Sequence, residues 1–355
     1  MSGALRAEIA GLIRETGPIG IDRYMALCLA HPVHGYYRTR DPLGPRGDFT
    51  TAPEISQMFG ELVGVWIALA REAMGAPERM TLVELGPGRG TLMADALRAL
   101  GRAAAGARFD LHLVETSPTL RAAQGAALAA HAPTWHEGIE TLPEGPAILV
   151  ANEFFDCLPV RQFQRTARGW CERVIGLDGE RLAFGLAPEP SPEITAPGPE
   201  GVLMTVPGAG LDLMRRLARR LASQGGAALA IDYGHARPGF GDTLQALARH
   251  AFVDPLADPG SADLTAHVDF SALARAAAAE GAAVHGPVDQ RDFLRAMGLD
   301  ARAERLKAKA DAAQAAAIDA AHARLTDPGR RGMGSLFKAM GVAAPGLPLP
   351  ALGRA

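Results

Sequence analysis

The sequence predicts an α/β fold with a doubly wound, largely parallel sheet, and three observations favour it. Short apolar runs of strand length alternate with amphipathic runs of helix length over residues 80–231, which is the pattern of consecutive β-α-β units. Three glycines at alternating positions, Gly86, Gly88 and Gly90, come directly after the first of these apolar runs. Because glycine lacks a Cβ, such a loop can turn sharply and lie close to a ligand at the carboxyl end of a strand.

The composition is that of an ordinary water-soluble chain. It has 355 residues, of which 48% are hydrophobic and 21% charged, a size that suits one large or two modest domains. The net charge of −3 gives no reason to expect general binding to nucleic acid or to an anionic membrane. No apolar run reaches the roughly 18 residues of a membrane span, so none is expected.

The cysteines and the first residues bear on the cellular compartment. Cys28, Cys157 and Cys171 show no metal-ligand spacing, which indicates free thiols in a reducing compartment and no metal site. The first thirty residues contain no signal-peptide core, and residues 1–17 carry two glutamates at helical spacing. We therefore expect a cytoplasmic protein.

The N-terminal part of the chain predicts helices around a long loop. Apolar positions recur at helical spacing over residues 4–16 and 21–29. Residues 31–53 are irregular, and a loop of this length inside a compact protein is often functional. A third helix is expected from Pro53 to about residue 74, since proline suits the first turn of a helix. Residues 1–77 are thus expected to form an N-terminal helical lobe and lid.

The predicted core contains five strands that share a short, apolar composition. They cover residues 80–85, 109–115, 133–135, 147–151 and 227–231. Helices over residues 92–100, 120–130 and 211–223 connect them, and a helix over 271–281 with a strand over 282–288 closes the sheet. The core is therefore expected to comprise residues 78–157 and 208–288.

Two further segments flank the predicted core. Residues 158–207 predict an inserted β-rich segment, with Asp178-Gly179 as the signal for a hairpin turn. Residues 290–325 are expected to be helical. They belong to a predicted C-terminal helical segment and tail over residues 289–355.

The glycine spacing favours S-adenosylmethionine over a nicotinamide dinucleotide as the ligand. The dinucleotide fingerprint is G-x-G-x-x-G, whereas the pattern here is E-x-G-x-G-x-G and begins at Glu84. An acid at that position commonly helps to position the amino group of S-adenosylmethionine. Glu115 ends the second strand and can accept the ribose hydroxyls, although NAD enzymes also use such an acid. No Lys-Ser or Lys-Thr follows the glycines, which excludes a P-loop.

The fourth strand ends in the candidate catalytic residues, Asn152-Glu153-Phe154-Phe155-Asp156. The Asn152 amide can offer a carbonyl oxygen to a substrate nitrogen. Paired carboxylates such as Glu153 and Asp156 suit a guanidinium and could accept the proton lost on N-methylation. Phe154 and Phe155 could pack on a sulfonium or on a planar guanidinium. The alternative is a helix N-terminus whose acids complement the helix dipole.

Several long motifs in this order resemble the MidA-like S-adenosylmethionine-dependent methyltransferases. The motifs are GDFTTAPEISQMFGE at 47–61, ELGPGRG at 84–90, NEFFDCLP at 152–159, GGAALAIDYGH at 225–235 and GSADLTAHVDF at 260–270. The resemblance extends over residues 15–340. It implies a class I methyltransferase (Rossmann-like) fold with S-adenosyl-L-methionine as cofactor. Mitochondrial members are assembly factors for respiratory complex I and methylate an arginine of one of its core subunits.

Transferred by position, the resemblance also implies roles for single residues. The residues implied in cofactor binding are Glu84, Gly86, Pro87, Gly88, Gly90, Glu115 and Thr51. Glu54 is implied in substrate binding, and residues 47–54 would fold over the site as a lid. From the residues themselves, Phe155 and Asp232, which follow the fourth and fifth strands, are further substrate-binding candidates. The chain departs from the family pattern at residues 204–207, where relatives often have a Glu and a Ser before the proline.

The expected activity is methylation of an arginine ω-nitrogen on a protein, and the resemblance implies a complex I core subunit as partner. Two alternatives stay open. One is a non-catalytic assembly chaperone that binds S-adenosylmethionine as a structural ligand, and the other is a small-molecule N- or O-methyltransferase. The sequence does not decide the acceptor, the symmetry of methylation or the oligomeric state. It also leaves open whether His235, Asp263 and Asp269 are functional.

Overall fold

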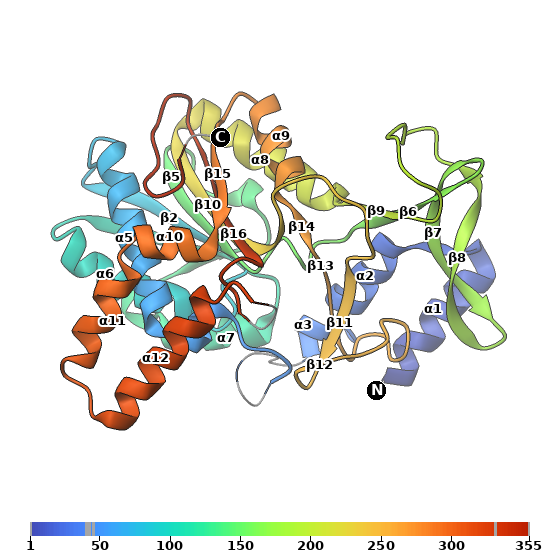
Figure 1. Cartoon of the computed structure of the whole chain (residues 1–355), viewed down its shortest axis with the longest axis horizontal. Helices are drawn as coiled ribbons and strands as arrows, with labels where there is room; N and C mark the ends of the chain where they lie inside the picture. The colour runs from blue at the N-terminus through green and yellow to red at the C-terminus, as the bar shows by residue number, and fades with distance from the viewer. Residues whose placement is uncertain (1, 40–43, 45–46, 330–331, 354–355) are drawn as a thin grey trace. The chain divides into compact units, whose positions relative to one another are not determined.

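The computed structural model describes residues 2–39, 44, 47–329 and 332–353 (Figure 1). The chain forms two compact units, each assembled from three separate segments. The first unit comprises Met1–Phe49, Asp156–Asp212 and Pro238–Val268. The second unit comprises Thr50–Phe155, Leu213–Arg237 and Asp269–Ala355.

The second unit is built on one large sheet with the strand order β15-β16-β10-β5-β2-β3-β4. Its parallel strands are β2 (Arg79–Leu85), β3 (Arg108–Val114), β4 (Thr134–His136), β5 (Ala147–Asn152) and β10 (Gly226–His235). These are the five strands that the apolar runs predict. The strand β16 (Phe337–Ala343) is antiparallel to both of its neighbours, β10 and β15 (Ala283–Asp289). The predicted doubly wound α/β fold is confirmed.

Helices of the second unit connect these strands (Figure 1). They are α4 (Ala52–Ile55), α5 (Gln57–Ala73), α6 (Thr91–Ala103), α7 (Pro118–Ala127), α9 (Phe270–Ala279), α10 (Gln290–Ala296), α11 (Leu299–Lys307) and α12 (Ala312–Thr326), with short 3-10 turns at Ala129–His131 and Ile139–Thr141. Helix α8 (Gly208–Gln224) starts in the first unit and continues into the second. The short strand β14 (Val268–Asp269) directly precedes α9.

Two expected helices are divided. The helix expected from Pro53 is interrupted at Ser56, whose extended backbone lets its side chain cap α5 by accepting a hydrogen bond from the Met58 N–H. The helical run expected over residues 290–325 forms three helices, because Gly298 at φ +97° separates α10 from α11 and Asp311 starts α12 with a capping box.

The helix α5, expected in an N-terminal lobe, belongs instead to the unit that contains the large sheet. Its buried Phe59 and Trp66 share a hydrophobic core with Ile148 and Val150 of β5. The Glu61 carboxylate of α5 also accepts hydrogen bonds from Arg302 of α11 at 2.7 and 2.9 Å. These contacts explain why the boundary between the units lies after residue 49 and not after residue 77.

The strand β16 corrects the sequence-based expectation, since the residue pattern predicts no strand at 337–343. It lies inside the sheet, so its side chains are buried on both faces and show no alternation. Its alanines and glycine are also weak strand formers. Gly341 has a packing role, because a Cβ there would lie 2.5 Å from the Leu349 side chain.

The first unit combines helices with two small antiparallel sheets. Its helices are α1 (Ser2–Thr16), α2 (Ile21–Ala30) and α3 (Tyr36–Thr39). One sheet contains β1 (Ile19–Gly20), β6 (Arg161–Thr166), β7 (Gly169–Asp178), β8 (Arg181–Pro190) and β9 (Leu203–Val206); the other contains β11 (Leu244–Ala248), β12 (Ala251–Phe252) and β13 (Asp263–Ala266). The predicted hairpin forms, with Asp178 opposite Arg181 across its turn.

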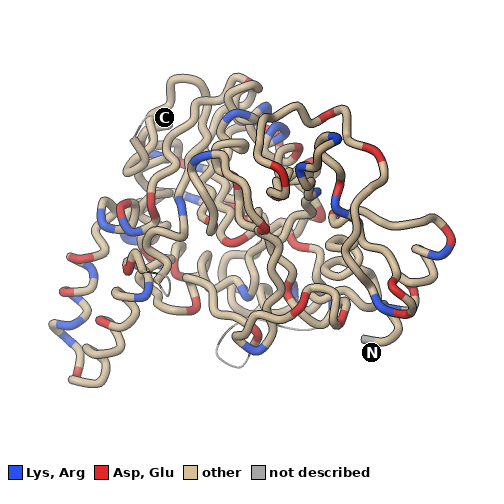
Figure 2. Tube along the Cα trace, turned by 45° about the vertical axis from the view of Figure 1, so that its right-hand side comes forward, with Lys and Arg blue, Asp and Glu red and all other residues tan. Residues whose placement is uncertain are grey.

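Charged residues of both signs are interspersed along the chain, as Figure 2 shows. Within the described ranges, no helix combines the length and the apolar character needed to cross a membrane.

Candidate active site

The loop after β2 has a backbone conformation that suits glycine. Gly86, Gly88 and Gly90 have φ angles of +62°, +54° and +83°, in the left-handed region that other L-residues rarely adopt. The Gly90 N–H donates to the Pro87 carbonyl at 2.8 Å and Gly90 directly precedes α6. A Cβ at Gly86 would lie 2.6 Å from the Phe154 ring. At Gly86, both the conformation and the space therefore require glycine.

Glu84 is a buried carboxyl group just before this loop. Its side chain is 2% exposed, and its Oε2 has no hydrogen-bond partner among the described residues. Burial raises the pKa of this carboxyl to about 8. A buried acceptor that lacks a donor costs about 1–3 kcal/mol, so this oxygen is suited to a ligand that supplies N–H groups.

Asn152 is the second buried acceptor without a donor. It ends β5 and is 8% exposed, and within the described chain its Oδ1 has no hydrogen-bond partner. Glu84 pairs with Val150 in the parallel ladder, and Asn152 follows Val150 by two positions. Since side chains alternate between faces along a strand, Glu84 and Asn152 lie on the same face of the sheet, at the carboxyl ends of adjacent strands.

Glu115 follows β3 and is held in one orientation by protein donors. Its Oε1 accepts the backbone N–H groups of Thr116 and Ser117, each at 2.7 Å, and its Oε2 accepts the Gln124 amide at 3.2 Å. Burial raises the pKa of this carboxyl, and these donors oppose the effect. A carboxylate offers about four lone-pair sites. Three are used here, so Oε2 keeps capacity for a ribose hydroxyl.

Gln124 is a residue that the sequence interpretation missed. It lies on α7 and is fully buried. Its amide nitrogen also donates to the Gly88 carbonyl at 2.7 Å, and its Oε1 accepts the indole N–H of Trp135 at 2.8 Å. The available signal was a glutamine four positions after Leu120, on the buried face of an amphipathic helix.

Glu153 directly follows β5 in a strained conformation. Its φ is +50°, which is rare for a residue with a side chain and is found mostly where the surroundings impose it. Its Oε1 accepts the Ala52 backbone N–H at 2.9 Å and the Asn152 amide at 3.2 Å. Its own N–H donates to the Ile231 carbonyl of β10 at 2.9 Å. The carboxylate thereby holds the first residue of α4.

Glu54 connects α4 to the glycine loop. Its Oε1 accepts the Thr91 hydroxyl at 2.6 Å, and its Oε2 lies 3.7 Å from a guanidinium nitrogen of Arg89. Thr51 precedes α4, and its carbonyl accepts the Glu54 N–H at 3.0 Å. The observed contacts of Glu54 are with the loop that follows β2, so its predicted contact with substrate stays a prediction, as does the contact of Thr51 with cofactor.

The predicted lid is shared between the two units. Residues 47–49 belong to the first unit, where Asp48 accepts the Tyr36 hydroxyl at 2.7 Å and the Arg249 N–H at 2.8 Å. Residues 50–54 belong to the second unit. Closure of the segment over the site stays a prediction.

Asp232 binds backbone groups around the turn after β5. Its Oδ2 accepts the N–H groups of Phe154 and Phe155 at 3.0 and 2.9 Å, and its Oδ1 accepts the Tyr233 N–H at 2.9 Å. The side chain is 1% exposed. These bonds give Asp232 a structural role in holding the turn. The sequence predicted substrate binding for this residue and did not indicate the structural role.

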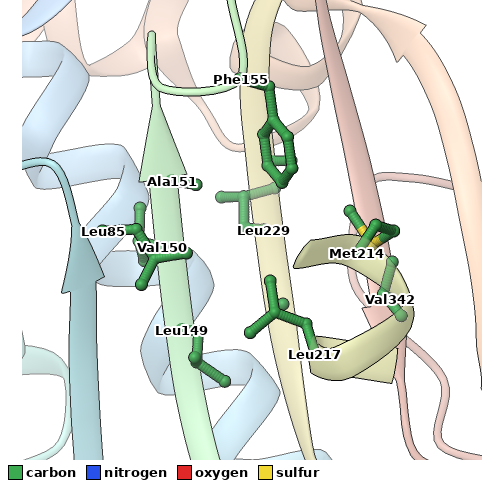
Figure 3. Close-up of a pocket in the computed structure, with 11 residues that line it drawn as sticks. Leu85, Leu149, Val150, Ala151, Phe155, Met214, Leu217, Leu229 and Val342 are labelled. Carbon is green, nitrogen blue, oxygen red and sulfur yellow. The ribbon is translucent and has the colours of Figure 1, made fainter. Parts of the chain in front are cut away.

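Phe155 lies in the hydrophobic core, in contrast to its predicted place at the substrate. It is 5% exposed and lines a small apolar cavity beside β10 and α8, together with Leu229, Met214 and Leu217 (Figure 3). Its ring meets the Phe154 ring edge to face, with the centroids 5.7 Å apart. These contacts favour a packing role, and they lend no support to direct substrate binding.

Asp156 belongs to the first unit, whereas Glu153 belongs to the second unit. The Asp156 side chain is 6% exposed, and its carbonyl accepts the Ala266 N–H at 2.9 Å. The paired-carboxylate arrangement therefore stays a prediction.

The three residues left open by the sequence have structural contacts. Asp269 caps α9 by accepting the Ala272 N–H at 2.9 Å. Asp263 accepts the Tyr37 hydroxyl at 2.7 Å. The His235 Nδ1 lies 2.7 Å from the Arg237 carbonyl oxygen.

Comparison with known proteins identifies the family. A family model described as "Putative S-adenosyl-L-methionine-dependent methyltransferase" matches residues 62–288. The chain belongs to this methyltransferase family. The matched residues include the glycine loop, Glu115 and the Asn152–Glu153 pair. The roles of these residues in binding and catalysis stay predictions.

Relatives extend the match over most of the chain. The mouse protein named protein arginine methyltransferase NDUFAF7, mitochondrial, is 42% identical over 329 residues, which cover 84% of this chain and 75% of the relative. Its Drosophila melanogaster homolog is 39% identical over 380 residues, covering 95% and 85%. A Burkholderia thailandensis protein crystallised with S-adenosyl-homocysteine matches with a TM-score of 0.85 and 32% identity, covering 99% of this chain and 94% of that one.

These findings confirm the MidA-like resemblance, the class I fold, the enzyme class and S-adenosyl-L-methionine as cofactor. The site residues of this methyltransferase fit the cofactor. The donor-lacking Glu84 oxygen suits its ammonium group, the glycine loop allows close approach, and Glu115 retains a lone pair for a ribose hydroxyl.

The expected cytoplasmic location is wrong on this comparison, because the named relatives from mouse, fly and other animals are all mitochondrial. The expectation rested on acidic residues near the start of the chain. Two acidic residues near the start of a chain do not decide its cellular compartment, because they do not show which targeting signal the cell recognises.

Proposed function

We propose that this methyltransferase transfers the methyl group of S-adenosylmethionine to an ω-nitrogen of an arginine side chain in a protein. The observation that carries the proposal is the Asn152 Oδ1, a buried acceptor that lacks a donor among the described residues and lies beside the Glu153 carboxylate. A guanidinium presents five N–H donors and no acceptor. Such a group can satisfy both side chains, and the mouse and fly relatives are named protein arginine methyltransferases.

The residues of the chain mainly position the acceptor and remove water from it. When bound, S-adenosylmethionine supplies a methyl group that its sulfonium already activates for displacement. Asn152 accepts an N–H of the guanidinium and directs the nitrogen lone pair toward the methyl position. Glu153 holds the cation and accepts the proton that the nitrogen loses.

The proposed partner is a core subunit of respiratory complex I. This step rests on the resemblance to the MidA-like family, whose mitochondrial members act on such a subunit, and on the mitochondrial names of the relatives. The net charge of −3 favours recognition of a particular protein segment over general binding to an acidic polymer.

The test uses the purified full chain, S-adenosylmethionine labelled in the methyl group, and protein extract from cells that lack the chain. We expect label in methylarginine after hydrolysis of the extract. Replacement of Gly88 by Val should abolish labelling together with cofactor binding. Replacement of Glu153 by Gln should abolish labelling while calorimetry shows cofactor binding.

Other outcomes of this experiment identify the alternatives. Label only in molecules below the size of proteins would show a small-molecule methyltransferase. No label in either fraction, combined with failed complex I assembly in cells that lack the chain and its rescue by the Glu153→Gln variant, would show a non-catalytic chaperone.

A further inference from the structure

Gln124 joins parts of the cofactor site that come from different segments of the chain. Its side-chain nitrogen lies 2.7 Å from the carbonyl oxygen of Gly88, the central glycine of the loop. The same nitrogen lies 3.2 Å from the Glu115 Oε2. One amide group therefore contacts both the loop after β2 and the acid after β3.

The orientation of this amide is fixed by its partners. The Trp135 indole N–H can only donate, so the atom that faces it at 2.8 Å must be the Gln124 oxygen. The Gly88 carbonyl can only accept, so the nitrogen must face the loop. Both amide hydrogens are then used, one on Gly88 and one on Glu115, and neither can be given up without leaving a buried acceptor unsatisfied.

The surroundings leave the glutamine no alternative position. Gln124 is fully buried, and the backbone of α7 lies against the loop, because a Cβ at Gly90 would be 3.6 Å from the Gln124 Cα and 3.2 Å from Leu128. Gln124 therefore has no exposed surface to offer a ligand. Any effect on cofactor binding must act through Gly88 and Glu115.

We propose that Gln124 is the positioning residue of the cofactor site, which sets the Gly88 peptide and the Glu115 carboxylate together in the orientation that S-adenosylmethionine requires. The inference rests on the proposed use of Glu115 as the ribose ligand. The Gly88 peptide is a flexible element held at φ +54°. A hydrogen bond on its carbonyl fixes the plane of the peptide, and a second one on Glu115 fixes the carboxylate that faces the ribose.

The test compares two substitutions in the full-length enzyme. Gln124→Met keeps the length of the side chain and removes both donated hydrogen bonds. Trp135→Phe is the matched control, because it removes the third bond of the same amide and leaves the two donated bonds in place. Calorimetry gives the Kd for S-adenosylmethionine, and thermal unfolding without ligand gives the stability of each variant.

We expect Gln124→Met to raise the Kd, and the KM for S-adenosylmethionine, by roughly tenfold or more, as expected for the loss of hydrogen bonds to a charged group. The kcat at saturating cofactor should change by less than about threefold, because Gln124 touches neither reacting atom. Trp135→Phe should leave the Kd within about twofold while lowering the unfolding temperature.

A double-mutant cycle distinguishes positioning from a general packing effect. If Gln124 acts through Glu115, the loss of affinity in Glu115→Gln combined with Gln124→Met will be clearly smaller than the product of the two single losses. Independent effects would multiply. Gln124→Leu, which removes the bonds to Gly88 and Glu115 without adding a charge, provides the same test if the methionine variant is unfolded.

The inference is overturned if both Gln124 variants bind S-adenosylmethionine as tightly as the wild type, or if the cycle shows no coupling. This failure differs from a failure of the proposed function. If only the proposed function fails, the wild type still binds S-adenosylmethionine and the Gln124 variants still bind it more weakly. No arginine in the protein extract then becomes methylated.

Discussion

The Glu153 carboxylate accepts a hydrogen bond from the backbone N–H of Ala52 at 2.9 Å, across 101 positions of the chain. The proposed catalytic base therefore also holds the start of α4. Substitutions can separate the two roles. A glutamine at 153 can still accept from Ala52 through its amide oxygen, whereas an alanine cannot.

We expect Glu153→Gln to lower kcat by about 100-fold or more, the range for loss of a general base, and to leave the cofactor Kd nearly unchanged. Glu153→Ala should lower kcat similarly and also weaken cofactor binding, because α4 would lose its anchor and Glu54 its position against Thr91. Calorimetry and initial rates distinguish the two variants. Equal cofactor affinities for both would show that the Ala52 contact has no bearing on the glycine loop.

Cofactor affinity should depend on pH through Glu84. Its pKa is about 8 in the protein without ligand, and the cofactor ammonium should lower it, since an opposite charge favours the ionised form. Binding therefore releases a proton, and affinity rises by up to about tenfold per pH unit toward pH 8. Glu84→Gln should flatten this part of the profile. This control is needed because the amino group of the cofactor titrates in the same region, near pH 8.

The same residue should reduce the stability of the protein without ligand. Burial raises the folded-state pKa of Glu84 above the ordinary glutamate value of 4.5, so the folded protein holds a proton that the unfolded chain releases. Its contribution to stability is therefore lost progressively as pH rises from about 4.5 to about 8. We expect Glu84→Gln to raise the unfolding temperature at pH 7.5, by the equivalent of a few kcal/mol, and to weaken cofactor binding. A lower unfolding temperature at that pH would contradict the assignment.

Gly86→Ala should abolish cofactor binding for two reasons, backbone strain and contact with the Phe154 ring. A matched control is Gly106→Ala, since Gly106 has a φ of +87° and nothing within 4 Å of an added Cβ. Both changes should cost about 1 kcal/mol or more through strain, measured by denaturant unfolding. Only Gly86→Ala should remove binding, and combination with Phe154→Ala should restore part of it. Binding by the single Gly86→Ala variant would show that the close approach is not required.

The sequence revealed those parts of the site that depend on local pattern. The strands at 80–85 and 147–151 are apolar runs followed by turn or polar residues. Gly86, Gly88 and Gly90 permit a left-handed backbone whatever surrounds them. Each of these signals lies within about ten residues of chain. For this reason the strand ends, the loop and the candidate residues Glu84, Glu115 and Asn152 could be named before the fold was known.

The remainder depends on contacts between distant segments, which local pattern does not encode. The role of Gln124 follows from its hydrogen bonds to Gly88, Glu115 and Trp135, which only the folded chain brings next to it. Asp232 has a structural role because the backbone N–H groups of Phe154 and Phe155, almost 80 positions earlier in the chain, donate hydrogen bonds to its carboxylate. The strand β16 has no alternation because it is buried on both faces, so its composition alone does not separate it from a buried helix or a loop.

The position of β16 has a consequence for synthesis of the chain. The strands β10 and β15 both pair with residues 337–343 and not with each other. A nascent chain that has emerged as far as α12 therefore carries two unpaired strand edges, which can pair with other chains. The large sheet can be completed only after residues 337–343 have been synthesised, so the edges of β10 and β15 stay open to other strands until then.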